Sequence, residues 1–472
     1  MAEFTTTKRS LSLFSLVMIN IIAIDSLRNL PVNAVNGFTI PFYYLIACLV
    51  FLIPCALITA ELATHYPQTG GSYVWIRNAF GPRIGFMAIA IQWIYNVFWY
   101  PTILAFVAAN IAYFINPALI DNKIYMISLI IGLFFAATVV NSFGMKTSSL
   151  ISIFSAIVGT IIPMVLIIFI AIFWIVKHKV MAISPSFHNW IPNFSNSQNI
   201  AFFVVILFSV FGLEMSSTHA ESVKKPEKNY PKALLYSSLF VVISLTLSTL
   251  AIAIIVPAQK LNLISGLDQA FSLFLSAEHL SFLLPLIVLA IIIGSFGSIA
   301  AWVIGPTKAL VVAADDGVLP KALGYRNKRN SPVLLLALQA IFVTAICGLF
   351  IFIKNFNTSY WILSALTAQL AIIFYIIFFA AAIKLHKKTA PKANAFRLKT
   401  WGMNLAAGLG ILTCVFALFI GFIPPTSVEI HSLFSYEAIL IFGVVFFSLV
   451  PFLIARKTSA PTPNENLSIE AN

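Results

Sequence analysis

Charged residues are scarce in this chain. Asp, Glu, Lys and Arg make up only 9% of its 472 residues, and 60% are apolar, whereas soluble domains carry about 25% charged residues. The chain therefore lacks the polar groups needed to cover a water-facing surface. Apolar runs of about 20 residues recur, the length that a helix needs to cross a hydrocarbon core of roughly 30 Å. The composition predicts an all-α integral membrane protein.

Cysteine and histidine are also too few or too scattered to build a metal or disulfide site. The four cysteines lie inside apolar runs and form no CxxC pair, which excludes a disulfide framework and a zinc site. None of the seven histidines pairs with another His, Cys or Asp at ligand spacing, and no HExxH motif occurs. We expect no metal, no cofactor and no enzymatic activity, with a membrane-embedded enzyme as a remote alternative.

The apolar runs predict about twelve transmembrane helices in one domain, residues 1–457, followed by a short disordered cytoplasmic tail, residues 458–472. The first five spans would form one repeat, about 11–177, and the next five a second, about 199–384, before two extra helices at about 401–455. The expected spans are 11–35, 40–62, 83–116, 122–142, 148–177, 199–222, 231–256, 281–314, 331–353, 358–384, 401–424 and 436–455.

The net charge of +13 is a topology signal. With a cytoplasmic N-terminus, 22 of the 28 Lys and Arg residues fall in cytoplasmic segments, five fall on the opposite side, and Arg28 lies within a span. Cytoplasmic loops carry such an excess of Lys and Arg. We therefore expect a multi-pass protein of the plasma (inner) membrane of a bacterium, with both termini cytoplasmic. We therefore expect the chain to contact the lipid bilayer and to bind no nucleic acid. Its oligomeric state stays open.

Two spans contain ionisable residues at mid-membrane depth beside helix-breaking residues. The first has Asp25 and Arg28 ahead of Pro31, and the sixth has Gly212 and Glu214 ahead of several Ser and Thr residues. Each predicts two half-helices joined by an unwound stretch, which is tolerated in a membrane only where it lines a cavity or is buried in protein. Half-helix N-termini suit a carboxylate, and unwound carbonyls suit an ammonium or a cation.

The interruptions occupy corresponding places in two five-helix halves, which is typical of an inverted-repeat transporter. In the alternative interpretation, Asp25, Arg28 and Glu214 only pair with one another inside a helix bundle. Buried ion pairs seldom stabilise a fold more than apolar packing does, so we favour the transporter.

Several segments resemble those of a known family. They are ELAT at 61–64, PQTGGSYVW at 67–75, AFGP at 79–82, GLE at 212–214 and AADDGVLP at 313–320. Together they resemble the amino acid–polyamine–organocation (APC) superfamily of permeases, over about residues 10–455. Within it, AWVIGP at 301–306 and STH at 217–219 are most similar to the glutamate/γ-aminobutyrate antiporter branch.

The resemblance implies a leucine-transporter-type fold, with a 5+5 inverted repeat plus two C-terminal helices, that works by alternating access. It implies that Glu214 faces the substrate site and that Phe208 and Trp302 are gating aromatics, although ordinary packing is an alternative for both rings. The small Gly-Ser-Gly type break that is common in the superfamily's first helix is absent here. We expect the substrate to contact both interruptions, through Asp25, Ser26, Arg28, Asn29, Phe211, Gly212 and Glu214.

Asp25 or unwound carbonyls would engage the α-ammonium of an amino acid, and N–H groups near Asn29 its α-carboxylate. Arg28 would meet an acidic side chain or hold Glu214 ionised. The expected function is amino acid exchange (antiport) of the glutamate/γ-aminobutyrate type. The main alternative is a symporter coupled to protons through Glu214 or His219, or to sodium. A substrate sensor is a remote alternative.

Overall fold

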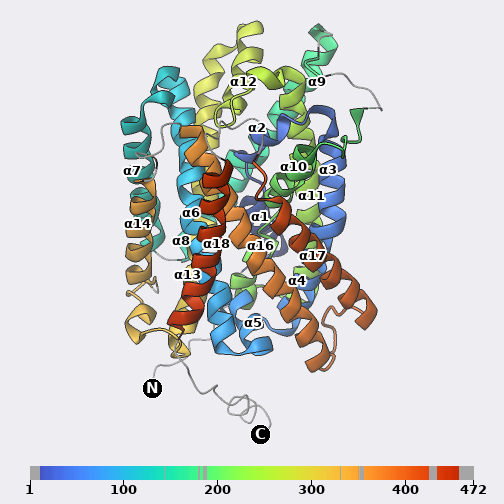
Figure 1. Cartoon of the computed structure of the whole chain (residues 1–472), viewed down its shortest axis with the longest axis vertical. Helices are drawn as coiled ribbons and strands as arrows, with labels where there is room; N and C mark the ends of the chain where they lie inside the picture. Colours follow the sequence, from blue (N-terminus) through green and yellow to red (C-terminus); the bar gives the residue numbers. More distant parts are fainter. Residues whose placement is uncertain are drawn as a thin grey trace.

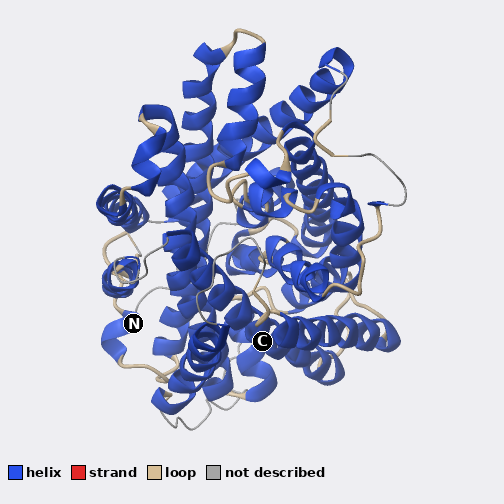
Figure 2. Ribbon diagram, turned by 45° about the horizontal axis from the view of Figure 1, so that its top comes forward, coloured by secondary structure: helices blue, strands red, loops and turns tan. Residues whose placement is uncertain are grey.

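The structure, a computed structural model, describes residues 11–143, 145–178, 181–183, 189–329, 331–348, 350, 356–424 and 433–455. Every regular element in these ranges is helical (Figure 1, Figure 2). The predicted tail at 458–472 lies outside the described residues.

Long helices run side by side along one axis of the molecule (Figure 1). The α-helices of the first half, long and short together, are α1 Leu13–Ile24, α2 Asn29–Ala34, α3 Ile40–Ala47, α4 Ile53–His65, α5 Ser72–Phe80, α6 Pro82–Ile115, α7 Lys123–Ser142, α8 Met145–Ala156 and α9 Ile162–His178. In the second half they are α10 Ser197–Ser209, α11 Pro226–Ile255, α12 Gly266–Ala277, α13 Leu284–Asp315, α14 Val333–Cys347, α16 Phe356–Lys388, α17 Thr400–Ile420 and α18 Leu433–Ile454.

Tighter or wider helical turns connect several of these helices. Two π-helical turns, η2 Cys48–Leu52 and η4 Ile157–Ile161, join α3 to α4 and α8 to α9 without a break. The ten-residue 3₁₀-helix η6 Leu213–Ser222 follows α10. Short 3₁₀ turns are η1 Gly37–Thr39, η3 Pro117–Asp121, η7 Ala258–Lys260, η8 Ser281–Leu283 and η9 Lys321–Gly324.

The predicted spans are found in the structure. Within the described ranges, ten helical segments are long and apolar enough to cross a membrane, and two shorter apolar helices, α1 and α14, match the first and ninth predicted spans. The α5 and α12 helices lie between predicted spans. Large apolar side chains face outward, with Phe434 81% and Ile124 80% exposed, as expected for a surface in contact with lipid.

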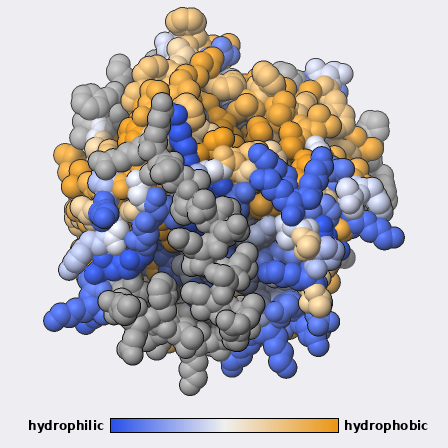
Figure 3. Space-filling model, turned by 90° about the horizontal axis from the view of Figure 1, so that it is seen from below, coloured by the Kyte–Doolittle hydropathy of each residue, from blue (hydrophilic) through white to orange (hydrophobic). Residues whose placement is uncertain are grey.

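One end of the molecule brings together the segments that carry the family resemblance. Arg77 of α5 forms an ion pair with Asp316 over 2.7 Å, at the end of α13. Thr69, in the turn before α5, donates a hydrogen bond to Glu221 of η6. Figure 3 views this end and shows hydrophilic residues over much of its described surface. The predicted cytoplasmic face would be this one.

Glu61, also on this end, holds three segments together. Its carboxylate contacts His386 Nδ1 of α16 over 2.5 Å and accepts a hydrogen bond of 2.7 Å from the backbone N–H of Leu398, ahead of α17. Both carboxylate oxygens are therefore engaged by α16 and the segment that follows it. We assign Glu61 a structural role.

The η4 turn and α13 cross in close contact, with two glycines facing each other. A Cβ atom built on Gly159 would lie 2.0 Å from the backbone N of Gly294. Small residues at such crossings let membrane helices approach closely. The α13 helix also packs against α1 and carries Trp302.

We expect Gly159→Ala to lower the midpoint of thermal unfolding of the detergent-solubilised protein by several degrees, because overpacking costs roughly 1–3 kcal/mol. Gly132→Ala is the matched control, since a Cβ atom there would meet nothing within 4 Å in the described part of the chain. Equal midpoints for the two variants would show that the crossing is loose.

Candidate functional site

The first helix is interrupted at the centre of the molecule. The α1 helix ends at Ile24, and α2 begins at Asn29, with Asp25 as the C-cap residue of α1. The indole N–H of Trp302 donates a hydrogen bond of 2.8 Å to the Ala23 carbonyl. The indole thereby satisfies one of the carbonyls that the end of α1 leaves free.

The second interruption separates α10 from η6. Gly212 has a φ of +116°, a left-handed conformation that side chains with a Cβ atom rarely adopt. The Tyr375 hydroxyl of α16 accepts a hydrogen bond of 2.8 Å from the Gly212 N–H and donates one of 2.6 Å to Glu214. Gln92 donates to the other Glu214 oxygen over 3.1 Å. Neutral donors from α6 and α16 therefore hold the start of η6.

Trp302 links the two interruptions. A Cβ atom built on Gly212 would lie 2.7 Å from the Trp302 ring and 3.3 Å from the Ala23 carbonyl. The indole therefore sits directly against the glycine while its N–H holds α1. Gly212 is needed both for its conformation and for this close approach.

Two small cavities flank these interruptions. One, of about 50 Å³, lies between α2, α10 and α16, and the other, of about 30 Å³, lies beside the end of α1. Phe208 and Asn29 line both. Since roughly 10–15 Å³ of such space holds one water, each cavity has room for a few waters, and neither holds an amino acid as it stands. Binding therefore requires the side chains between them, Phe208 above all, to move.

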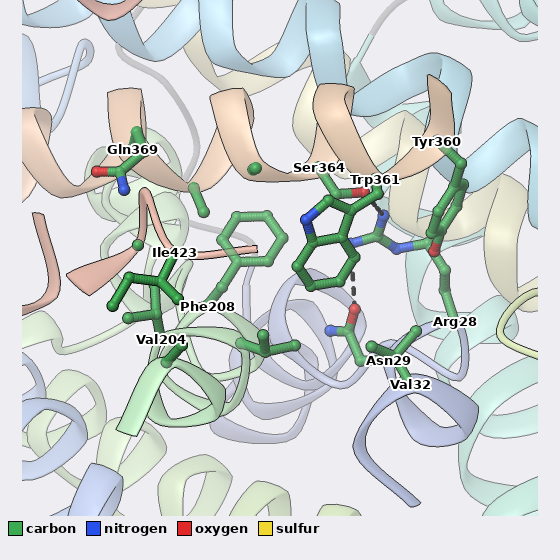
Figure 4. Close-up of a pocket in the computed structure, with 15 residues that line it drawn as sticks. Arg28, Asn29, Val32, Val204, Phe208, Tyr360, Trp361, Ser364, Gln369 and Ile423 are labelled. Atoms are coloured by element: carbon green, nitrogen blue, oxygen red, sulfur yellow. Dashed lines mark hydrogen bonds between the residues drawn. The ribbon is translucent and has the colours of Figure 1, made fainter. Parts of the chain in front are cut away.

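Arg28 is the charged residue of the larger cavity (Figure 4). Its guanidinium donates hydrogen bonds to three neutral side chains: Thr102 over 2.6 Å, Asn29 over 3.1 Å and Ser364 over 3.5 Å. The rings of Phe208 and Tyr360 lie 5.8 and 5.7 Å from its central carbon. The residue is only 3% exposed, so a buried positive charge faces the cavity.

The sequence-predicted site residues separate into two groups. Those that line a cavity are Ser26, Arg28, Asn29, Phe208, Phe211 and Trp302. Those that line neither cavity are Asp25, Gly212, Glu214 and His219.

Asp25 and Glu214 are each buried and bound elsewhere. Asp25 accepts a hydrogen bond from Ser244 of α11, and Glu214 is held by Tyr375 and Gln92. No ion pair joins Asp25, Arg28 and Glu214, all three of which the structure describes. The alternative in which these residues only pair with one another is therefore wrong.

Several neighbours of the site were not found by sequence reasoning. They are Gln92, Tyr360, Trp361, Ser364 and Tyr375. Polar and aromatic residues are frequent throughout the spans, and nothing local marks these five. Within the part of the chain that the structure describes, no group of three or more His, Cys, Asp and Glu residues is placed to hold a metal ion.

Comparison with known proteins covers nearly the whole chain. A family model described as amino acid permease matches residues 11–447. A protein of Legionella pneumophila named as an uncharacterized transporter is 46% identical over 454 residues, 96% of this chain and 97% of the relative. A glutamate/γ-aminobutyrate antiporter of Lactococcus lactis is 28% identical, covering 95% of this chain and 90% of the relative. A probable agmatine/putrescine antiporter of Lactococcus lactis is 24% identical, covering 95% and 96%.

We expect Tyr375→Phe to slow transport by about tenfold or more, because it removes a hydrogen bond to the buried Glu214 carboxyl group and leaves the Gly212 N–H unpaired. Transport is measured with the purified variant in lipid vesicles. Tyr100→Phe is the control, since it also removes a buried tyrosine hydroxyl, but one that contacts neither Gly212 nor Glu214. Equal slowing in both variants would contradict a specific role for Tyr375.

Proposed function

Because the chain belongs to the amino acid permease family, we propose that it exchanges amino acids across the membrane and that each substrate carries a carboxylate, as glutamate and γ-aminobutyrate do. The observation that best supports this proposal is the buried Arg28 guanidinium. It faces the larger cavity, and its hydrogen-bond acceptors are all neutral side chains. A buried charge is costly unless it is paired. The substrate carboxylate supplies that pair.

The charge of Arg28 also favours substrates that carry a carboxylate over substrates that carry only amines. Agmatine and putrescine, which appear in the name of one relative, are cations without a carboxylate. An unpaired guanidinium would repel them in a low-dielectric cavity. Glutamate and γ-aminobutyrate, which appear in the name of another relative, both present the group that Arg28 binds best, since guanidinium and carboxylate match in geometry.

The smaller cavity supplies the complementary end of the site. It is lined by Ala23, Ile24 and Ser26, where α1 ends. The C-terminal end of a helix carries a partial negative charge, which suits an α-ammonium group. We therefore place the substrate ammonium there and a carboxylate at Arg28, with the chain of the substrate passing Phe208.

Alternating access follows from the same elements. Phe208 separates the two cavities, and it lies on α10 directly ahead of the Gly212 break. Rotation of α10 about that break would move Phe208 and join the cavities. The packing of Phe51, Phe211 and Tyr375, with ring centroids 4.6 to 4.9 Å apart, would carry this motion to η2 and α16.

Vesicles that contain the purified protein and trapped γ-aminobutyrate should accumulate labelled glutamate, whereas empty vesicles should not. An exchanger needs substrate inside the vesicle, because the carrier reorients to the outside only when a substrate is bound to it. Neutral amino acids, agmatine and putrescine are tested as competitors. Equal uptake into empty vesicles under an imposed ion gradient would show a symporter instead.

Arg28 variants test the site within the same assay. Arg28→Ala should raise the KM for glutamate at least tenfold, because a charge-assisted hydrogen bond is lost, and Arg28→Lys should retain part of the affinity. Arg326→Ala is the control, because Arg326 pairs with Asp315 on the surface. An unchanged KM in Arg28→Ala would remove Arg28 from the substrate site.

A further inference from the structure

Asp25 is a buried carboxylate within the first helix break, and its side chain lines neither of the two substrate cavities. We propose that Asp25, held by Ser244 of α11, forms a proton-binding site that is separate from the substrate site. The proposal rests on membership of the permease family and not on which amino acids are exchanged.

The two Asp25 oxygens have different surroundings. Oδ2 accepts a hydrogen bond of 2.6 Å from Ser244, whereas Oδ1 is buried and has no partner among the described residues. The residue is 1% exposed. Arg28, three residues along the chain, turns to Thr102 and Ser364 instead, and Asp25 takes part in none of the ion pairs formed by the described residues. An isolated buried charge is too costly to keep, and a bound proton removes it.

A polar cluster centred on the Tyr44 hydroxyl of α3 lies near this carboxylate. The hydroxyl accepts hydrogen bonds of 2.8 Å from Asn33 and 3.4 Å from Ser209. Asn33 Oδ1 is buried and has no hydrogen-bond partner in the described part of the chain. Tyr44 is the titratable group of this cluster, whereas Ser244 of α11, which does bond to Asp25, does not titrate.

The position of Asp25 links proton binding to the transport cycle. Asp25 caps α1, and its N–H is bonded to the Ile21 carbonyl over 2.7 Å. Three residues later the chain presents Arg28 and Asn29 to the substrate cavity. Protonation therefore changes the charge at the junction of the two half-helices, and binding at either site changes the affinity of the other.

A proton fits this site better than a metal cation does. Asp25 lines neither of the two cavities, and Ser244 is the one side chain in hydrogen-bond contact with its carboxylate among the described residues. A metal cation needs several oxygen ligands and space between them. A proton needs one carboxylate oxygen.

The test uses vesicles that contain the purified full-length chain and a trapped pH-sensitive dye. Glutamate uptake by the wild-type protein should acidify or alkalise the interior in proportion to the substrate moved, and its rate should depend on pH. In Asp25→Asn we expect the proton movement per glutamate to disappear and the pH profile to flatten. Ser237→Ala is the control, because Ser237 is buried on α11 and bonded to Asn20 rather than to Asp25.

Ser244→Ala keeps the Asp25 carboxyl group, so it tests the proposal even if Asp25→Asn misfolds. It should retain proton movement with a profile shifted toward higher pH by about one unit, because the carboxylate loses its hydroxyl donor. An unchanged proton count and pH profile in Asp25→Asn would overturn the proposal. So would uptake that requires sodium or potassium and loses this requirement in Asp25→Asn.

A second experiment tests the proton site even if the protein does not exchange amino acids. The infrared band of a protonated carboxyl group, followed against pH on the purified protein without substrate, should lose one component in Asp25→Asn and none in Ser237→Ala. Identical spectra for Asp25→Asn and the wild-type protein would overturn the proton site regardless of what the protein transports.

Discussion

The structure depends on satisfying two broken helices in the middle of a membrane protein. An unwound backbone at that depth leaves N–H and C=O groups that lipid does not hydrogen-bond. Two aromatic side chains meet part of this requirement: Trp302 donates to the Ala23 carbonyl and packs against Gly212, and Tyr375 accepts from the Gly212 N–H. Because each side chain comes from another helix, the breaks are tied to α13 and α16. Movement of either helix therefore reaches the substrate cavities directly.

Three buried ionisable groups around the breaks remain apart, and this separation gives them different roles. Arg28 faces a cavity, Glu214 is held by neutral donors, and Asp25 turns to α11. Pairing would have cancelled the charges and left the cavity without a means of attracting a substrate. The free guanidinium accounts for the preference for carboxylates that we propose, and the isolated Asp25 carboxylate accounts for the proton site.

Sequence reasoning located the breaks because Asp25, Arg28, Gly212 and Glu214 are conspicuous within apolar runs. It did not determine which way each side chain points, since that depends on which helices pack against the break. Ser244 and Tyr375, which lie about 160 or more positions away from their partners, are ordinary residues of their spans. The spans themselves follow from hydrophobic length alone, and the division into repeats stays a prediction.

The central claim is that Arg28 selects substrates by their carboxylate, and binding to the purified protein tests it most directly. γ-Aminobutyrate and putrescine have similar length and share one amino group, but the first ends in a carboxylate and the second in another amine. The account predicts that unlabelled γ-aminobutyrate displaces labelled glutamate and that putrescine does not. Equal displacement by the two compounds would contradict it.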